Sequence, residues 1–154
     1  MSRGFFSAGA LAVIVALCAC SSSNPSVSPT TGPACALPSG VSNPFMVYPA
    51  NGSTVAGSNV TGIYVATEGG PLTGSGLSWN VIIVDANNPQ GLGSFPFSSV
   101  SGPPPGGATP PYSNAFYQLA SYGGPFGSGQ SVTVYLNNLN SNCAAFKIGS
   151  FTTT

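Results

Sequence analysis

Short runs of alternating apolar and polar residues follow one another from about Val41 to the end of the chain, separated by clusters of Gly, Pro, Asn and Ser. Alternation with a period of two predicts half-buried β-strands. No stretch keeps a 3.6-residue apolar period between capping residues, so we expect little or no helix. The predicted strands cover residues 44–49, 59–67, 77–86, 92–97, 114–120, 130–138 and 145–153.

Differences among these runs predict where each strand lies in a sheet. The run 77–86 is apolar on both faces, which is typical of a central strand. The run 44–49 has a proline at each end and suits a sheet edge, because proline has no N–H to donate to a neighbouring strand. The weaker run 92–97 is also predicted as an edge strand. In the last run, 145–153, Gly149 interrupts the alternation and indicates an irregularity.

Four segments in order give the chain a resemblance to immunoglobulin-like and fibronectin type III-like domains. They are "MVYPANGSTV", the Trp79-bearing "LSWNVIIV", the late "VTVYLNNLNSNC" and the closing "GSFTT". The resemblance covers residues 35–154 and implies a single antiparallel β-sandwich of about seven strands. One feature departs from antibody domains, in which the disulfide joins two facing core strands. Here Cys35 precedes the first strand and Cys143 lies in the last hairpin turn.

Charge is almost absent from this sequence. It contains two basic and two acidic residues, no histidine, and 42% hydrophobic residues, enough for a core despite 21 Gly and 15 Pro. The charged residues are Arg3, Glu68, Asp85 and Lys147. Nucleic-acid binding requires clustered Lys and Arg, so we expect no nucleic-acid partner. Two carboxylates are too few for an acidic cation cage, so we also expect no metal or other cofactor.

The same scarcity argues against catalysis. A nucleophilic Ser, Thr or Cys needs a neighbouring base, and without histidine only Glu68, Asp85 and Lys147 remain. A glycosidase needs two carboxylates flanking one bond, but Glu68 and Asp85 fall in separate turns or strand ends and are expected to be solvated. The "GSGLS" stretch at 74–78 lacks the strand and helix context of a hydrolase nucleophile. The sequence therefore predicts a protein that is not an enzyme.

The first nineteen residues read as a secretory signal peptide. Arg3 precedes the apolar run "FFSAGALAVIVALCA" at 5–19. Fifteen helical residues span about 22 Å, less than the roughly 30 Å hydrocarbon core of a bilayer. This length favours a cleaved signal over a transmembrane helix.

The end of the apolar run, Leu17-Cys18-Ala19-Cys20, resembles the bacterial lipobox. The resemblance implies cleavage before Cys20, acylation of its thiol, and attachment to the membrane through this lipid. Ser21 follows the anchor in place of the aspartate that retains lipoproteins at the inner membrane, which favours the outer membrane. Residues 20–34 are rich in Ser, Pro and Thr and are expected to form a flexible linker. An ordinary signal cut after Ala19, without lipid, is the alternative.

The lipobox resemblance leaves two cysteines in the mature domain. Cys18 departs with the signal and Cys20 carries lipid, so Cys35 and Cys143 remain. Beyond the inner membrane the compartment is oxidising, and we expect these two residues to form a disulfide. A zinc site is the alternative, but two thiols without histidine supply too few ligands.

Several aromatic residues late in the chain are candidates for ligand binding. Tyr112, Tyr117 and Tyr122 lie among Gly, Ser, Asn and Gln, a setting in which exposed rings can stack on sugars. The alternative is that such rings pack in or over the core. The proline-rich segment 102–112 can present a polyproline ligand or be a plain exposed loop.

These observations together predict a lipid-anchored bacterial cell-envelope protein. Its domain is expected to act as a structural or interaction module, with an envelope protein or a polysaccharide as its partner. A surface glycan-binding module is the alternative function.

Overall fold

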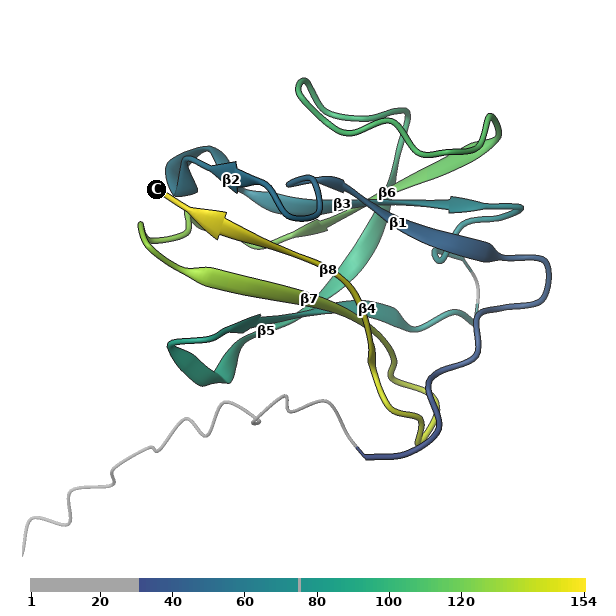
Figure 1. The fold of residues 1–154 in the computed structure, drawn as a ribbon. Helices are drawn as coiled ribbons and strands as arrows, with labels where there is room; N and C mark the ends of the chain where they lie inside the picture. The colour runs from purple at the N-terminus through teal and green to yellow at the C-terminus, as the bar shows by residue number, and fades with distance from the viewer. Residues whose placement is uncertain (1–30, 75) are drawn as a thin grey trace, which may run out of the picture.

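The computed structural model describes residues 31–154 apart from residue 75 and the side chains of residues 89–92. Figure 1 shows a fold made almost wholly of strands, and the described residues contain one short 3₁₀ turn, Gly57–Asn59, and no α-helix. The expectation of an all-β protein is therefore confirmed. The strands are β1 Ser42–Tyr48, β2 Thr54–Val55, β3 Gly62–Glu68, β4 Trp79–Asp85, β5 Asn88–Val100, β6 Ala115–Ser121, β7 Ser131–Asn138 and β8 Phe146–Thr153.

All eight strands belong to one hydrogen-bonded sheet. Their order is β1-β3-β6-β5-β4-β7-β8-β2, with every pair antiparallel except β2 and β8. The sheet curls, so that β1 and β3 lie across the core from β7 and β8 (Figure 1). The hydrogen-bond pairing thus gives one curled, mixed sheet and no division into two sheets.

Strand β5 is what makes the sheet continuous. Its residues 88–96 pair with β4, and its last four residues, 97–100, pair with β6. The predictions of a break over residues 87–91 and of a short edge strand at 92–97 are wrong, since the turn is confined to Ala86 and Asn87 and β5 lies inside the sheet. The physical reason is that each half of β5 has only one partner strand. Pro96 has no N–H to donate, but it can pair with Asn80 because no second strand lies on its other side to need that donor.

Other positional predictions are confirmed. β4, the strand that is apolar on both faces, lies between β5 and β7, and β1 lies at one edge of the sheet. The irregularity at Gly149 is a register shift, because Val134 pairs with Gly149 while Tyr135 pairs with Lys147.

Gly149 also explains how closely β1 approaches β8. A Cβ atom on Gly149 would lie 2.9 Å from Cε of Met46, which is itself only 1% exposed. Contacts that close essentially do not occur in real structures. A glycine here lets the Met46 side chain lie directly on the β8 backbone.

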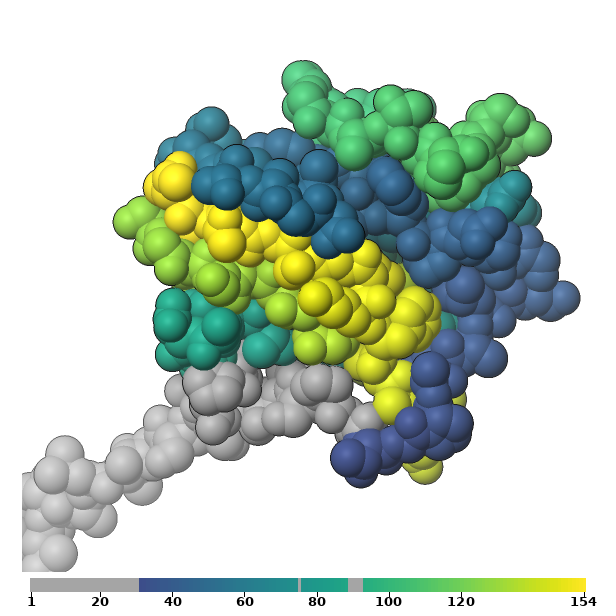
Figure 2. Space-filling view, viewed as in Figure 1, coloured from purple at the N-terminus to yellow at the C-terminus, as the bar shows by residue number. Residues whose placement is uncertain are grey.

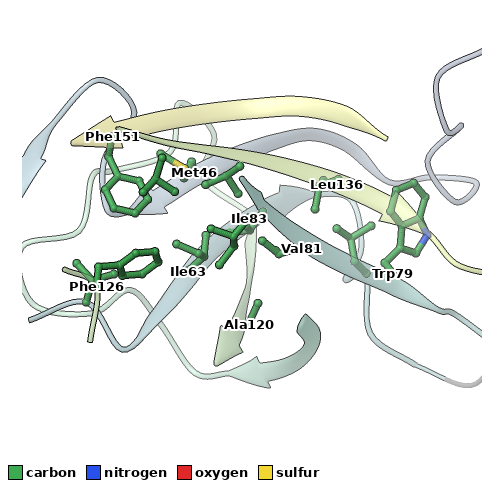
Figure 3. Close-up of a cluster of buried hydrophobic side chains, with 14 of the residues drawn as sticks. Met46, Ile63, Trp79, Val81, Ile83, Ala120, Phe126, Leu136 and Phe151 are labelled. Carbon is green, nitrogen blue, oxygen red and sulfur yellow. The ribbon is translucent and has the colours of Figure 1, made fainter. Parts of the chain in front are cut away.

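The core fills the space inside the curl (Figure 3). Ile63 and Val65 of β3 lie in one cluster with Val81 and Ile83 of β4 and with the buried residues of β7. Trp79 lies at one end of this cluster, while Phe126 and Phe151 lie at the other (Figure 3). Trp79 is 3% exposed, as expected for a core residue.

Candidate functional site

Cys20, the predicted lipid anchor, lies outside the described residues, as do the predicted signal peptide and most of the predicted linker. The other candidate residues can be placed. Cys35 and Cys143 are joined, Tyr112 and Tyr117 lie near each other, and Tyr122 belongs to a separate group of rings.

The disulfide between Cys35 and Cys143 is present, with their Cα atoms 4.8 Å apart. Two backbone hydrogen bonds flank it, from Cys35 N–H to Ala144 O and from Ala144 N–H to Pro33 O, both 2.9 Å long. Ala34 and Ala144 also form an isolated parallel bridge. The start of the domain is therefore fixed, covalently and through its backbone, to the loop between β7 and β8.

Tyr112 contributes to a small polar surface at the start of β1. Its hydroxyl donates to the carbonyl oxygen of Asn43 at 2.9 Å. The side-chain amide of Asn43 donates in turn to Oε2 of Glu68 at 2.6 Å, and the Ser42 hydroxyl donates to the same oxygen at 3.4 Å. Asn43 adopts a φ of 48°, in the left-handed region that asparagine tolerates better than most residues. These bonds connect the proline-rich segment, β1 and the end of β3.

Ionisation of Tyr112 is opposed by its surroundings. Partial burial is the main cause, and the nearby Glu68 carboxylate and Tyr117 add to it, so the pKa of Tyr112 rises from 10.0 to about 12. The same effect shows that Tyr117 lies within electrostatic range of Tyr112. Two of the three candidate tyrosines therefore lie near each other.

Tyr122 lies elsewhere. Its ring stacks on that of Phe126, with centroids 4.4 Å apart and an interplanar angle of 18°, and it meets Phe95 edge-on at 5.4 Å. Phe126 is only 4% exposed. Tyr122 thus packs against the core and shares none of the contacts of Tyr112, as the core-packing alternative predicts.

The proline-rich segment is not a plain exposed loop. Ala108 N–H donates to the carbonyl oxygen of Val47, on β1, at 2.8 Å, and Pro110 is buried. Figure 2 shows the segment in green at the top of the molecule, packed onto the body below it. The segment is a loop with exposed residues at 103, 105, 106, 109 and 111, as expected, but it is also anchored, because it satisfies backbone groups of β1. It covers a sheet edge that would otherwise be free to pair with another chain.

The two carboxylates of the domain serve separate structural roles. Asp85 is 4% exposed, and it accepts hydrogen bonds from Asn87 N–H and from the Gln130 side chain, each 3.0 Å long. Glu68 is the last residue of β3, as Asp85 is the last residue of β4, and it accepts from Ser42 and Asn43. The expectation that both are solvated turn residues is wrong for Asp85, because it ties the β4–β5 turn to the start of β7.

Gln118 is a buried polar residue that the sequence pattern did not single out. It is fully buried on β6, where its amide group donates to the Thr67 hydroxyl at 3.0 Å and its Oε1 accepts from Leu72 N–H at 3.3 Å. The alternation of the run 114–120 places Gln118 on the same face as the buried Ala120, which was the available signal. Its role is to hold the segment after β3 against the sheet.

One concavity gathers apolar side chains. It has a volume of about 480 Å³, and its lining comes from the β3–β4 connection, the start of β4, β5 and the loop after β7. Leu77 and Leu139 line it and are 37% and 57% exposed, respectively. Leu139 N–H donates to Ser78 O at 2.9 Å, so the two leucines are held on adjoining segments. No charged side chain is among its lining residues.

A second concavity, of about 310 Å³, lies over β7 and β8. The cross-strand pairs Ser131–Thr152 and Thr133–Ser150 contribute to its lining. Its lining therefore combines hydroxyl and apolar groups and includes no charged side chain.

Within residues 31–154, leaving out residue 75, no group of three or more His, Cys, Asp or Glu side chains is placed to hold a metal ion. That part of the chain also has no helix of the length and hydropathy needed to cross a membrane. Comparison of the chain with protein-family models, curated proteins and solved structures found no match.

Proposed function

We propose that this chain is a bacterial cell-envelope lipoprotein whose β-domain acts as a non-catalytic structural or interaction module. The observation that carries the proposal is the Cys35–Cys143 disulfide. Disulfides persist in oxidising compartments and are rare in the cytosol of most cells, so this bond supports export of the chain. It also accounts for two of the four cysteines and leaves the two that belong to the lipobox.

The proposed anchor is the acylated thiol of Cys20. Support comes from the apolar run 5–19, from Leu17 and Ala19 at the positions that the lipobox requires, and from the polar segment that follows. Several acyl chains on one residue bind a membrane far more firmly than a single chain does. Ser21 favours the outer membrane as the destination.

The finer architecture that we propose is an immunoglobulin-like sandwich. The strand order supports it, because β1, β3, β6 and the end of β5 can form one layer, and the start of β5 with β4, β7, β8 and β2 the other. This grouping follows the two layers of immunoglobulin domains. An experimental structure in which these groups do not face each other across one core would contradict it.

The positions of the ionisable groups support a module without catalysis. Asp85 and Glu68 are occupied by hydrogen bonds to neighbouring turns and strands, and they lie on different strands. The chain instead offers neutral surfaces made of hydroxyl, amide and apolar groups. Such surfaces suit binding to another envelope component.

Metabolic labelling with a fatty-acid analogue tests the anchor. The wild-type chain should be labelled, and Cys20→Ser should abolish the label. Cys18→Ser is the matched control and should stay labelled, because Cys18 is removed with the signal. Label that persists in Cys20→Ser, or is lost in Cys18→Ser, would contradict the proposal.

Glycan binding is the second candidate function. The observation that favours it is the proximity of Tyr112 and Tyr117, together with the hydrogen bonds that connect Tyr112 to Asn43 and Asn43 to Glu68. Titration with cell-wall polysaccharides should change tyrosine fluorescence, and Tyr117→Ala should remove the change. Tyr122→Phe, within the core, should leave it intact. An unchanged signal across a broad panel of polysaccharides would exclude this function.

A further inference from the structure

The described residues expose three large hydrophobic side chains, Leu77, Phe116 and Leu139. Two of the three, Leu77 and Leu139, line the same 480 Å³ concavity, which we call the leucine concavity. Phe97 of β5 and Trp79 of β4 extend its apolar lining. Apolar side chains scattered singly on a surface need no explanation, but a cluster around a hollow indicates an interaction site.

The leucine concavity lies at the end of the domain where the N-terminal segment is attached. Leu139 begins the loop between β7 and β8, and Cys143, in the same loop, is bonded to Cys35. The backbone bonds of Ala144 to Pro33 and Cys35 fix the arrangement. The concavity therefore has a nearly fixed position relative to the first described residues.

Chain length keeps this end of the domain close to the proposed anchor. The eleven residue steps from Cys20 to Thr31 span at most about 40 Å even when fully extended. A tether of this length holds the domain at a high effective concentration relative to the membrane, on the order of millimolar for short linkers. A surface with weak intrinsic affinity is then sufficient for binding.

The chemistry of the concavity fits a lipid surface. Its lining holds no charged side chain, so insertion among headgroups does not require the desolvation of an ion. Its hydroxyl and amide groups, on Thr73, Ser78 and Asn80, can remain hydrogen-bonded at the interface. A stable protein partner would bury about 1,200 Å² or more in total, whereas a tethered membrane contact needs only a few apolar side chains.

We propose that the leucine concavity docks onto the bilayer that carries the lipid anchor, with Leu77 and Leu139 inserted at the headgroup boundary. This inference rests on the anchor proposed above. Docking would give the domain one orientation on the membrane. The tether alone would leave that orientation free.

Trp79 is the only tryptophan of the chain and lines the concavity, so its fluorescence reports directly on docking. The lipidated full-length protein is reconstituted into phosphatidylethanolamine–phosphatidylglycerol vesicles, with or without bromine atoms on the upper acyl carbons. Bromine quenches tryptophan only at short range. We expect a loss of Trp79 emission in brominated vesicles relative to unbrominated ones.

Two variants separate docking from simple tethering. Leu139→Ser, and more completely Leu77→Ser with Leu139→Ser, should restore the emission while the protein still floats with the vesicles. Pro125→Ser alters an exposed apolar residue beside Phe126, at the other end of the core, and should leave the quenching unchanged. Thermal unfolding of each variant checks that the domain remains folded.

The outcomes distinguish the inference from the proposed anchor. Flotation with the vesicles without quenching of Trp79 overturns the docking and leaves the anchor standing. Quenching that survives the double leucine variant also overturns it. Absence of both flotation and fatty-acid label overturns the anchor itself, and the docking with it.

Discussion

The two ends of the core are held in different ways. At one end, Trp79 packs edge-on against Phe146, and the Cys35–Cys143 disulfide joins the first residues of the domain to its last loop. At the other end, four aromatic rings pack in series with no covalent bond between them. We call these the disulfide end and the aromatic end. Each holds one terminal segment of the domain in place, but by different means.

At the aromatic end the rings form a connected chain of contacts. Phe95 meets Tyr122, Tyr122 stacks on Phe126, and Phe126 meets Phe151 edge-on at 5.4 Å. The end of β8 is held there by Thr153, whose N–H donates to Gln130 O and whose hydroxyl accepts from Gln130 N–H and donates to Gly127 O. The C-terminal residues are thus fixed by packing and hydrogen bonds together.

The disulfide end has fewer rings and relies on bonds of other kinds. Trp79 and Phe146 form its ring pair, with centroids 6.3 Å apart. The disulfide, the buried amide of Gln118 and the Tyr112–Asn43–Glu68 bonds supply further connections on this side. The comparison indicates that reductant and alkaline pH act mainly on the disulfide end, whereas loss of buried volume acts most strongly on the aromatic end.

The largest effect is expected from Phe126→Ala at the aromatic end. Phe126 is 4% exposed and touches two other rings, so its removal leaves a cavity that the strands cannot close. Truncation of a buried phenylalanine costs about 3–5 kcal/mol. Urea unfolding should show this loss.

The matched control for Phe126→Ala is Phe116→Ala, which removes the same side chain from a position that is 42% exposed. Surface substitutions usually change stability by about 0.5 kcal/mol or less. If the two variants lost equal stability, the aromatic end would not be the packing centre described here.

Next in size is the removal of the disulfide. Cys35→Ser combined with Cys143→Ser frees the loop between two residues that are 108 positions apart in the chain, and loss of a native disulfide from a small domain costs about 2–5 kcal/mol. Addition of reductant to the wild-type protein should lower its stability to that of the double variant. The same reductant should not change the difference in free energy of unfolding between Phe126→Ala and the wild-type protein. An identical unfolding curve with and without reductant would contradict the role of this end.

Much of the fold could be predicted from local pattern. The apolar run of β4 identified a central strand, the prolines around β1 identified an edge, and Gly149 identified the register shift of β8. These features are written in consecutive residues, because a strand's burial and its pairing capacity depend on its own side chains and N–H groups.

The features that escaped prediction depend on partners far away in the chain. β2 has only two residues and exists because they pair with Thr152 and Thr153. The proline-rich segment has the composition of an exposed loop, and only the distant carbonyl of Val47 turns it into a cover for β1. The tyrosines illustrate the same limit for the candidate site. Composition grouped Tyr122 with Tyr112 and Tyr117, whereas its position next to Phe126 directs it to the core.

A smaller effect is expected from Gln118→Leu, which tests the polar support of the disulfide end. The substitution keeps the volume but leaves Leu72 N–H without its acceptor. An unsatisfied buried donor costs about 1–3 kcal/mol. Urea unfolding measures the loss, and a double-mutant cycle with Thr67→Val should show a coupling between the two side chains, which are 3.0 Å apart. Strictly additive effects would show that this hydrogen bond contributes nothing.

The smallest effect is expected from Tyr112→Phe, and its signature is a pH dependence. Burial, together with Glu68 and Tyr117, raises the pKa of Tyr112 from 10.0 to about 12, so between these values the folded state binds more protons than the unfolded state. The stabilisation contributed by neutral Tyr112 is therefore complete below pH 10 and is lost as the pH rises towards 12. Urea unfolding across this range should show a fall in the free energy of unfolding, and Tyr112→Phe should reduce this fall.

At neutral pH the variant loses one exposed hydrogen bond to Asn43, worth about 0.5–1.5 kcal/mol. A wild-type protein and a variant with the same slope between pH 10 and 12 would show that Tyr112 does not stabilise the start of β1 through its neutral form.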